Sequence, residues 1–116
     1  MSVRKLIIGG ALALTVTAAS AAEKDTYSSA NFWLPYCKAW LTAHADDDAP
    51  IREGICVGEV NGLAYASCAD IPAGVTFEQE VRVVIRHIDM RPQRMHEPFL
   101  DLALEALIDA WPCRPR

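Results

Sequence analysis

The sequence of 116 residues has no surplus of basic residues, because 11 Lys and Arg stand against 15 Asp and Glu, a net charge of −4. Phosphate binding needs clustered positive charge, so this balance argues against nucleic acid as a partner. The chain also contains no G-x-S-x-G, H-E-x-x-H, Walker or dinucleotide-binding motif. It has no C-x-x-C pair, and its three histidines are scattered, which argues against structural zinc. We therefore expect no catalytic residues, no metal and no cofactor.

Long apolar runs are confined to the N-terminus. Two basic residues precede an uncharged stretch over residues 6–18, and small residues follow it. This order is typical of a secretory signal peptide, with cleavage after Ala21 or Ala22. The run is shorter than the roughly 20 residues that span a bilayer, so we favour a cleaved signal over residues 1–22 above an uncleaved anchor helix. The mature chain then has 9 Lys and Arg against 15 Asp and Glu, a charge of −6. We expect an exported, periplasmic protein without a membrane span.

All four cysteines lie after the signal: Cys37, Cys56, Cys68 and Cys113. An even number of cysteines in a small exported domain predicts two disulfides. A chain this short buries only about 60–65% of its surface on folding, so its core alone gives marginal stability. We expect both disulfides to be needed for the fold.

The mature chain reads as a flexible polar arm over residues 23–30 followed by an all-α domain over 31–113. No stretch alternates apolar and polar residues as a half-buried strand does. The periodicity predicts four helices, at about 32–43, from 51 to 66, from Thr76 to the residue before Pro92, and from Pro98 to about 111.

Capping signals mark the helix starts. Asn31 suits the N-cap of the first helix, and Thr76 with Gln79 has capping-box spacing for the third. Pro98 suits the first position of the fourth helix, which makes Glu97 its cap. Apolar residues at core spacing are predicted on the last two helices: Val81, Val84, Ile85 and Ile88, then Leu100, Ala103, Leu104, Leu107, Ile108 and Trp111.

Three glycines recur at intervals of four on the second predicted helix: Gly54, Gly58 and Gly62. Each costs about 1 kcal/mol relative to alanine within a helix, so the pattern needs a compensating reason. Charged residues interrupt the segment, which argues against a membrane helix pair. We expect close packing of this face against the aromatic residues of the first helix, with a ligand groove as the alternative.

Four helices with short turns fold most simply as an up-down bundle. Cys37 and Cys56 then lie at similar distances from the first turn and face each other. Cys68 ends the second helix, and the fourth helix returns Cys113 to that same end. The topology therefore predicts the disulfides Cys37–Cys56 and Cys68–Cys113.

Three polar features remain open. His87 lies beside the apolar stripe of the third helix, where we expect a packed or surface side chain. His96 lies in the turn before the fourth helix, either as a contact residue or merely as a polar residue of the loop. The acidic run 46–48 fits a solvated turn, with attraction of a cation or a basic partner as the alternative.

Several elements in order resemble the type VI secretion amidase immunity (Tai) family, also known through the resistance-associated immunity proteins. They are Cys56-Val-Gly-Glu-Val-Asn-Gly62, then Cys68, Pro72-Ala-Gly-Val-Thr76, His96-Glu-Pro98 and Leu104-Glu-Ala-Leu-Ile-Asp-Ala-Trp-Pro-Cys113. The resemblance implies a small helical periplasmic protein, not an enzyme. Such a protein binds a peptidoglycan amidase effector and blocks its active-site cleft, commonly as a homodimer.

Two functions follow as hypotheses. The first is this amidase inhibitor, whose acidic surface would steer it toward a basic enzyme. Its contact surface is predicted on the turn before the fourth helix and on the start of that helix, with Arg91, Gln93, Arg94, His96 and Glu97. The alternative is a periplasmic acid-stress chaperone of the HdeA type, since acidic residues and histidines change charge at low pH.

Overall fold

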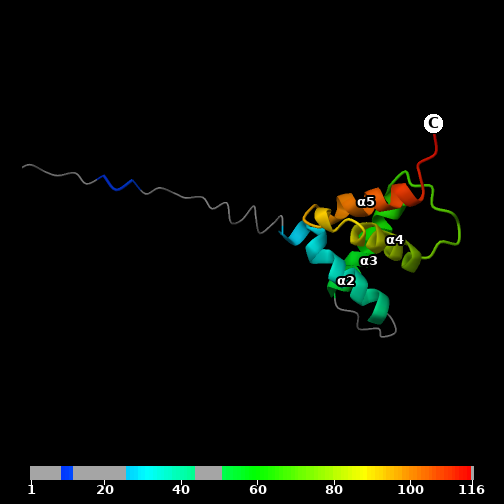
Figure 1. The fold of residues 1–116 in the computed structure, drawn as a ribbon, viewed down its shortest axis with the longest axis horizontal. Helices are drawn as coiled ribbons and strands as arrows, with labels where there is room; N and C mark the ends of the chain where they lie inside the picture. The colour runs from blue at the N-terminus through cyan, green and yellow to red at the C-terminus, as the bar shows by residue number, and fades with distance from the viewer. Residues whose placement is uncertain (1–8, 12–25, 44–50, 116) are drawn as a thin grey trace, which may run out of the picture.

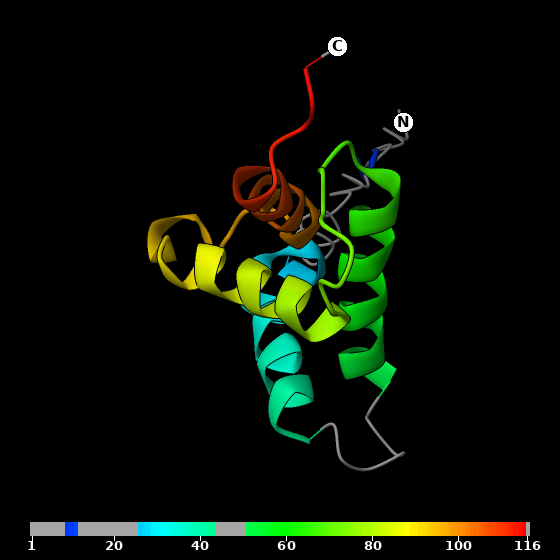
Figure 2. The ribbon, with the colours of Figure 1, turned by 90° about the vertical axis from the view of Figure 1, so that its right-hand side faces the viewer.

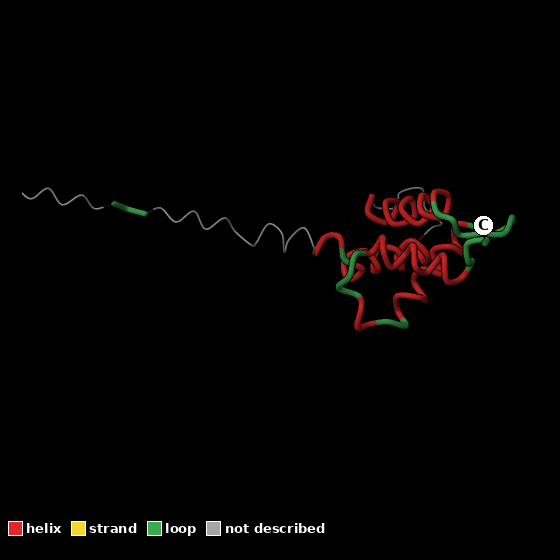
Figure 3. Tube along the Cα trace, turned by 90° about the horizontal axis from the view of Figure 1, so that it is seen from above, coloured by secondary structure: helices red, strands yellow, loops and turns green. Residues whose placement is uncertain are grey.

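The computed structural model describes residues 9–11, 26–43 and 51–115. Over these ranges the regular secondary structure is helical, with no named strand (Figures 1 and 3). The all-α prediction is confirmed. The elements are α2 (Ala30–Ala43), α3 (Ile51–Ala66), α4 (Phe77–Asp89), the 3₁₀ helix η1 (Pro92–Arg94) and α5 (Phe99–Ala110). Apart from residues 9–11, the predicted signal peptide lies outside the described residues, as does the acidic run 46–48. No described helix meets the length and apolarity of a membrane span.

The helices α2 and α3 form an antiparallel hairpin, and α4 crosses it (Figure 2). The chain then passes through η1 and returns along α4 as α5. Every pair among the four α-helices is in contact, so they share one core. That core includes Leu34, Val60 and Phe99, each at most 2% exposed.

The apolar stripe predicted on α4 is confirmed, because Val81, Val84, Ile85 and Ile88 are all buried. The stripe predicted on α5 is correct only in part. Ala103 and Leu107 are buried as expected, but Leu100 is 45% exposed. The buried set is instead Phe99, Leu102, Ala103, Ala106 and Leu107. Small alanines occupy core positions here, and the periodicity of large apolar residues therefore misplaced the inward face by about one residue.

The predicted capping box of α4 is confirmed. The Gln79 N–H donates to Thr76 Oγ1 at 3.2 Å, and the Thr76 N–H donates to Gln79 Oε1 at 2.9 Å. The caps predicted at Asn31 and Glu97 are wrong. Asn31 lies inside α2, and its N–H donates to the Met95 carbonyl at 2.8 Å. Pro98, not Glu97, is the N-cap of α5.

The chain before α2 is held by the segment that precedes α5. Residues 26–28 are helical, and Ser29 and Ala30 are 5% and 0% exposed. Ser29 forms an isolated antiparallel bridge with Pro98, and the Ala30 N–H donates to the Glu97 carbonyl at 3.0 Å. The end of the segment expected to be a flexible arm is therefore part of the folded core.

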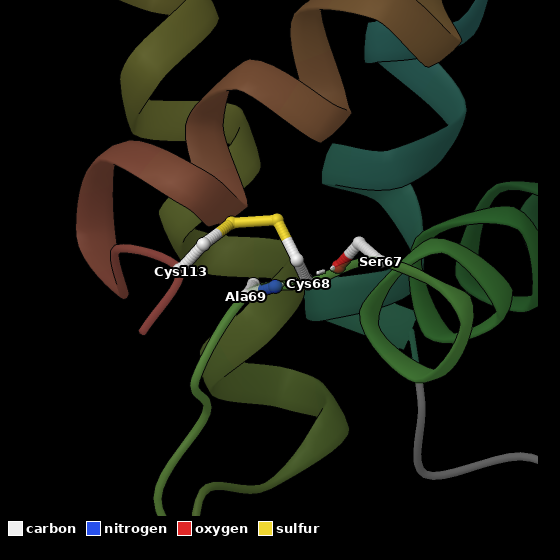
Figure 4. Close-up of a disulfide and its surroundings, with 4 residues drawn as sticks. All are labelled: Ser67, Cys68, Ala69 and Cys113. Carbon is white, nitrogen blue, oxygen red and sulfur yellow. Dashed lines mark hydrogen bonds between the residues drawn. A yellow bond between two sulfur atoms is a disulfide. The ribbon is translucent and has the colours of Figure 1, made fainter. Parts of the chain in front are cut away.

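Both predicted disulfides are confirmed. Cys37–Cys56 joins α2 to α3 in the core, where both residues are fully buried. Cys68–Cys113 lies near the surface and joins the end of α3 to the segment after α5 (Figure 4). Beside it, the Asp70 N–H donates to the Trp111 carbonyl at 3.1 Å. These contacts fix the C-terminal segment on the connector between α3 and α4.

Removal of the surface disulfide by Cys68→Ala with Cys113→Ala should destabilise the protein by roughly 4 kcal/mol, because the bond closes a 45-residue span in the unfolded chain. Cys68 is exposed, so little packing is lost with it. Urea denaturation followed by circular dichroism measures the difference. An unfolding free energy within about 1 kcal/mol of the native protein, or a peptide map that joins Cys37 to Cys68, would contradict this account.

Candidate functional site

The glycine face of α3 does not pack as predicted. Gly54, Gly58 and Gly62 are exposed, and apart from the chain neighbours and the backbone of α3 itself, no described atom lies within 4 Å of where a Cβ would stand on any of them. The helix instead turns Glu53, Cys56 and Val60 inward. The prediction of close packing against the aromatic residues of α2 is therefore wrong, and the glycines lie on an open face.

The predicted contact residues lie together in the loop 91–98, which projects beside the start of α5 (Figure 2). The structure divides them into two groups. Gln93 and His96 are exposed, whereas Arg91, Arg94 and Glu97 are partly buried. The first pair can touch another molecule directly, and the second group has contacts inside the chain.

Arg94 is the centre of the loop. Its Nε and Nη2 donate to Glu97 Oε2 and Oε1 at 2.6 and 3.1 Å, and its Nη1 donates to Glu105 Oε2 at 2.7 Å. Charged hydrogen bonds with two contacts to one carboxylate fix direction as well as distance. Arg94 therefore ties the loop both to itself and to α5.

His87 joins this network from α4. Its Nε2 lies 3.1 Å from Glu105 Oε2, and its Nδ1 lies 3.7 Å from Asp109 Oδ2. The side chain is 8% exposed, so His87 is packed, which is one of the two positions expected for it. One oxygen of Glu105 thus faces groups from both α4 and the loop, and it couples these elements to α5.

The carboxylates of the network have lowered pKa values. The hydrogen bond from Arg94 lowers the pKa of Glu97, and the contact with His87, followed by that with Arg94, lowers the pKa of Glu105. In turn, hydrogen bonds to Glu97 and Glu105 raise the pKa of Arg94. The network is therefore most stable with both carboxylates ionised.

The loop 91–98, which Arg94 holds in place and which we call the braced loop, also orders the start of α2. The carbonyls of Met95 and Glu97 accept hydrogen bonds from the first two N–H groups of α2, those of Asn31 and Ala30. At the other end of the loop, Arg91 Nη1 donates to the His87 carbonyl at 2.9 Å. The loop carbonyls thus hold the first two N–H groups of α2, and the hydroxyl of Ser29, not the predicted Asn31, accepts a hydrogen bond from the Phe32 N–H at 3.4 Å.

Two members of this site, His87 and Glu105, were not predicted as part of it. They lie 7 and 11 residues from Arg94 in sequence, on different helices, so no local spacing relates them. Only the return of α5 along α4 brings them together. The buried histidine on α4 and the glutamate on α5 could be assigned to the site only once the packing of α5 along α4 is known.

Two hollows flank the loop. His96 lines a pocket of about 260 Å³ with Thr26, Ser29 and Asn31. At the start of the loop, a groove of about 350 Å³ between α4 and α5 is lined in part by Arg86 and Arg91. Within the described ranges, no group of three or more His, Cys, Asp or Glu could hold a metal ion, and no cysteine is free.

The fold and this loop define a small, disulfide-bonded helical domain that presents one braced loop to its surroundings. Residues 16–113 match the family of Rap1a immunity proteins, and the chain belongs to this family. No curated protein and no solved structure matches the chain.

Family membership confirms the predicted resemblance at the level of type VI secretion immunity proteins. It implies a non-enzymatic inhibitor that binds an effector. The two disulfides, taken with the family, suggest an exported protein. The family match gives no support to the alternative of an acid-stress chaperone.

Replacement of Arg94 by Met should release the loop without unfolding the domain. Because the carbonyls of Met95 and Glu97 hold the first N–H groups of α2, the amides of Ala30 and Asn31 should lose hydrogen-exchange protection. Amides in the core of α4 should keep theirs. Exchange measured residue by residue by NMR tests this expectation.

The matched control is Arg82→Met, which removes an exposed arginine whose ion pair with Glu78 lies within α4. This variant should leave the amides of Ala30 and Asn31 protected. Equal loss of protection in both variants, or none in Arg94→Met, would show that the network does not hold the start of α2.

The Arg94→Met variant should also differ from the native protein in how its stability depends on pH. The folded-state pKa values of Glu97 and Glu105 are lowered from 4.5, so their contribution to stability is present above that pH and is lost as the pH falls through the lowered values. The gap in melting temperature between the native protein and Arg94→Met should stay constant from about pH 7 to 5.5 and shrink below about 4.5. Glu59 and Glu80, whose pKa values burial raises, act in the opposite direction but equally in both proteins. A gap that persists unchanged at about pH 3 would contradict the assignment.

Proposed function

We propose that this protein is a periplasmic inhibitor of a type VI peptidoglycan amidase, and that its loop 91–98 covers the active-site cleft of that enzyme. Membership of the Rap1a family supports an effector as partner. The observation that carries the choice of surface is the braced loop, which is exposed at Gln93 and His96 and fixed beneath them by Arg94.

A braced loop suits inhibition on physical grounds. Enzyme active sites lie in concave clefts, and a projecting loop is complementary to such a shape. Ordering a mobile loop on binding costs free energy, which a loop held in advance avoids. Arg94 and Glu97 form an ion pair within the loop. Neither charge is therefore left unpaired when the interface excludes water.

The cellular location is part of the proposal. The N-terminal sequence has the order of a secretory signal, and disulfides persist in the oxidising periplasm. Peptidoglycan lies in that compartment, so an inhibitor must meet its enzyme there. Cleavage after Ala21 or Ala22 removes the signal in this account.

Homodimerisation, which the family resemblance implies, also belongs to the proposal. Ile51, Ile55 and Tyr65 are 82%, 40% and 93% exposed on the outer side of α3. Exposed apolar side chains that share one helix face favour contact with another molecule. A second copy is the partner proposed for this face.

The proposal is tested with the type VI effector encoded nearest to this gene. Its expression in the periplasm of a test bacterium should lyse the cells, and co-expression of this protein with its signal should restore growth. The purified protein should inhibit peptidoglycan hydrolysis at a one-to-one ratio. An effector that cuts no amide bond in peptidoglycan, or one that this protein does not inhibit, would refute the amidase assignment.

A steric probe tests the surface. Gln93→Trp places a large side chain on the loop and should weaken inhibition by about tenfold or more, since the two surfaces can no longer meet closely. The matched control is Ala73→Trp on the exposed connector between α3 and α4. Equal effects of the two substitutions would place the interface elsewhere.

A further inference from the structure

A pocket of about 240 Å³ lies where the start of α2, the middle of α3 and the start of α5 meet. Its walls include the aromatic residues Tyr27 and Trp33, and α3 contributes the carboxylate of Glu59. Pro98, Phe99 and Leu100 complete an apolar side. Ser28 also lines it, so the pocket combines aromatic rings, apolar surface, one hydroxyl-bearing residue and one acid.

Among the described residues, the carboxylate of Glu59 has no counter-charge. Its Oε2 is shielded from solvent and has no hydrogen-bond partner, and no described basic residue forms an ion pair with it. Burial raises the pKa of this group. A desolvated carboxylate is unfavourable unless a cation or hydrogen-bond donors compensate it, so the site lacks one component.

Tyr27 and Trp33 belong to a larger aromatic cluster, and another part of that cluster already holds a cation. Tyr27, Phe32, Trp33 and Tyr36 form ring contacts with centroids 5.0–6.2 Å apart. The guanidinium of Arg52 lies 5.4 Å from the ring centroids of both Phe32 and Tyr36. Arg52 Nη1 also donates to the Tyr36 hydroxyl at 2.6 Å.

Arg52 and Glu59 are seven residues apart on α3, two turns along the same side of the helix. One end of the cluster thus receives a cation from the chain itself. The other end offers rings and an acid with which no described basic residue pairs. Rings of this kind attract cations through their negative faces.

We propose that the Glu59 pocket binds the ammonium or guanidinium group of a Lys or Arg side chain that belongs to the protein partner. This inference rests on the proposed function for the identity of the partner. The charge of the cation complements Glu59, its apolar stem fits along Pro98 and Leu100, and the rings of Tyr27 and Trp33 flank it. Pro98 belongs to both the loop and the pocket, so a partner seated on the loop reaches the pocket.

The pocket can be tested without the effector. N-acetyl-lysine methylamide and N-acetyl-arginine methylamide are titrated into the ¹⁵N-labelled mature protein, and N-acetyl-norleucine methylamide serves as the uncharged analogue. The indole N–H signal of Trp33, assigned with Trp33→Phe, should shift saturably with the two cations at millimolar concentrations. The norleucine analogue should shift it far less.

Two variants that each remove one negative charge distinguish binding in the Glu59 pocket from a general attraction of cations to an acidic protein. Glu59→Gln should weaken binding of the cations by about fivefold or more. Asp101→Asn removes an exposed acid close to Leu100 in sequence and should leave binding unchanged. Glu59→Gln should fold at least as stably as the native protein, because it removes an uncompensated carboxylate. Equal binding of lysine and norleucine analogues, or unchanged cation binding in Glu59→Gln, would overturn the proposal.

The effector assay separates this inference from the proposed function. If the effector is inhibited and Glu59→Gln weakens its binding while Asp101→Asn does not, the partner supplies the cation. If the effector is inhibited and Glu59→Gln has no effect, the pocket proposal fails while the proposed function stands. If no amidase is inhibited but the small cations still bind through Glu59, the proposed function fails. The cation site then stands, and only the identity of the partner that supplies the cation is lost.

Discussion

The contact of Arg94 with Glu97 and Glu105 is the interaction on which the loop and the two helix starts beside it depend. It fixes the loop between α4 and α5. That loop supplies the carbonyls that start α2, and it places Phe99 in the core at the start of α5. A single guanidinium thus sets the positions of two helix starts that are far apart in sequence. The exposed part of the loop owes its fixed shape to the same group.

The parts of the fold that sequence predicted well depend on neighbours along the chain. The bounds of α3, the capping box at Thr76 and the stripe of α4 all follow from spacings within one helix. The disulfide pairing followed from the order of the helices and the lengths of the turns. The prediction failed where distant segments decide the outcome. The start of α2 is set by carbonyls of the loop, and no local pattern at Asn31 shows this.

The glycines of α3 mark a different limit of sequence reasoning. Their spacing correctly identified an unusual face, but it did not say which way that face points. The inward direction of α3 is decided by Cys56, which the disulfide with Cys37 pulls into the core, and by Val60 one turn later. Glycine then occupies the opposite side, where it adds no contact within the described chain. The helix therefore depends on its inner side and its disulfide more than on intrinsic helix propensity.

The distribution of satisfied and unsatisfied charge separates the two halves of the candidate interface. In the loop, Arg94 and its acids compensate one another, so this part is complete before any partner arrives. In the adjoining pocket, Glu59 has rings beside it, but no basic residue in the described part of the chain pairs with it. A complete network gives shape, because its members are already fixed, whereas an incomplete one gives selectivity, because only a partner with the missing charge relieves it. A rigid loop beside an uncompensated acid is thus an arrangement in which the fold supplies the geometry and the partner supplies the cation.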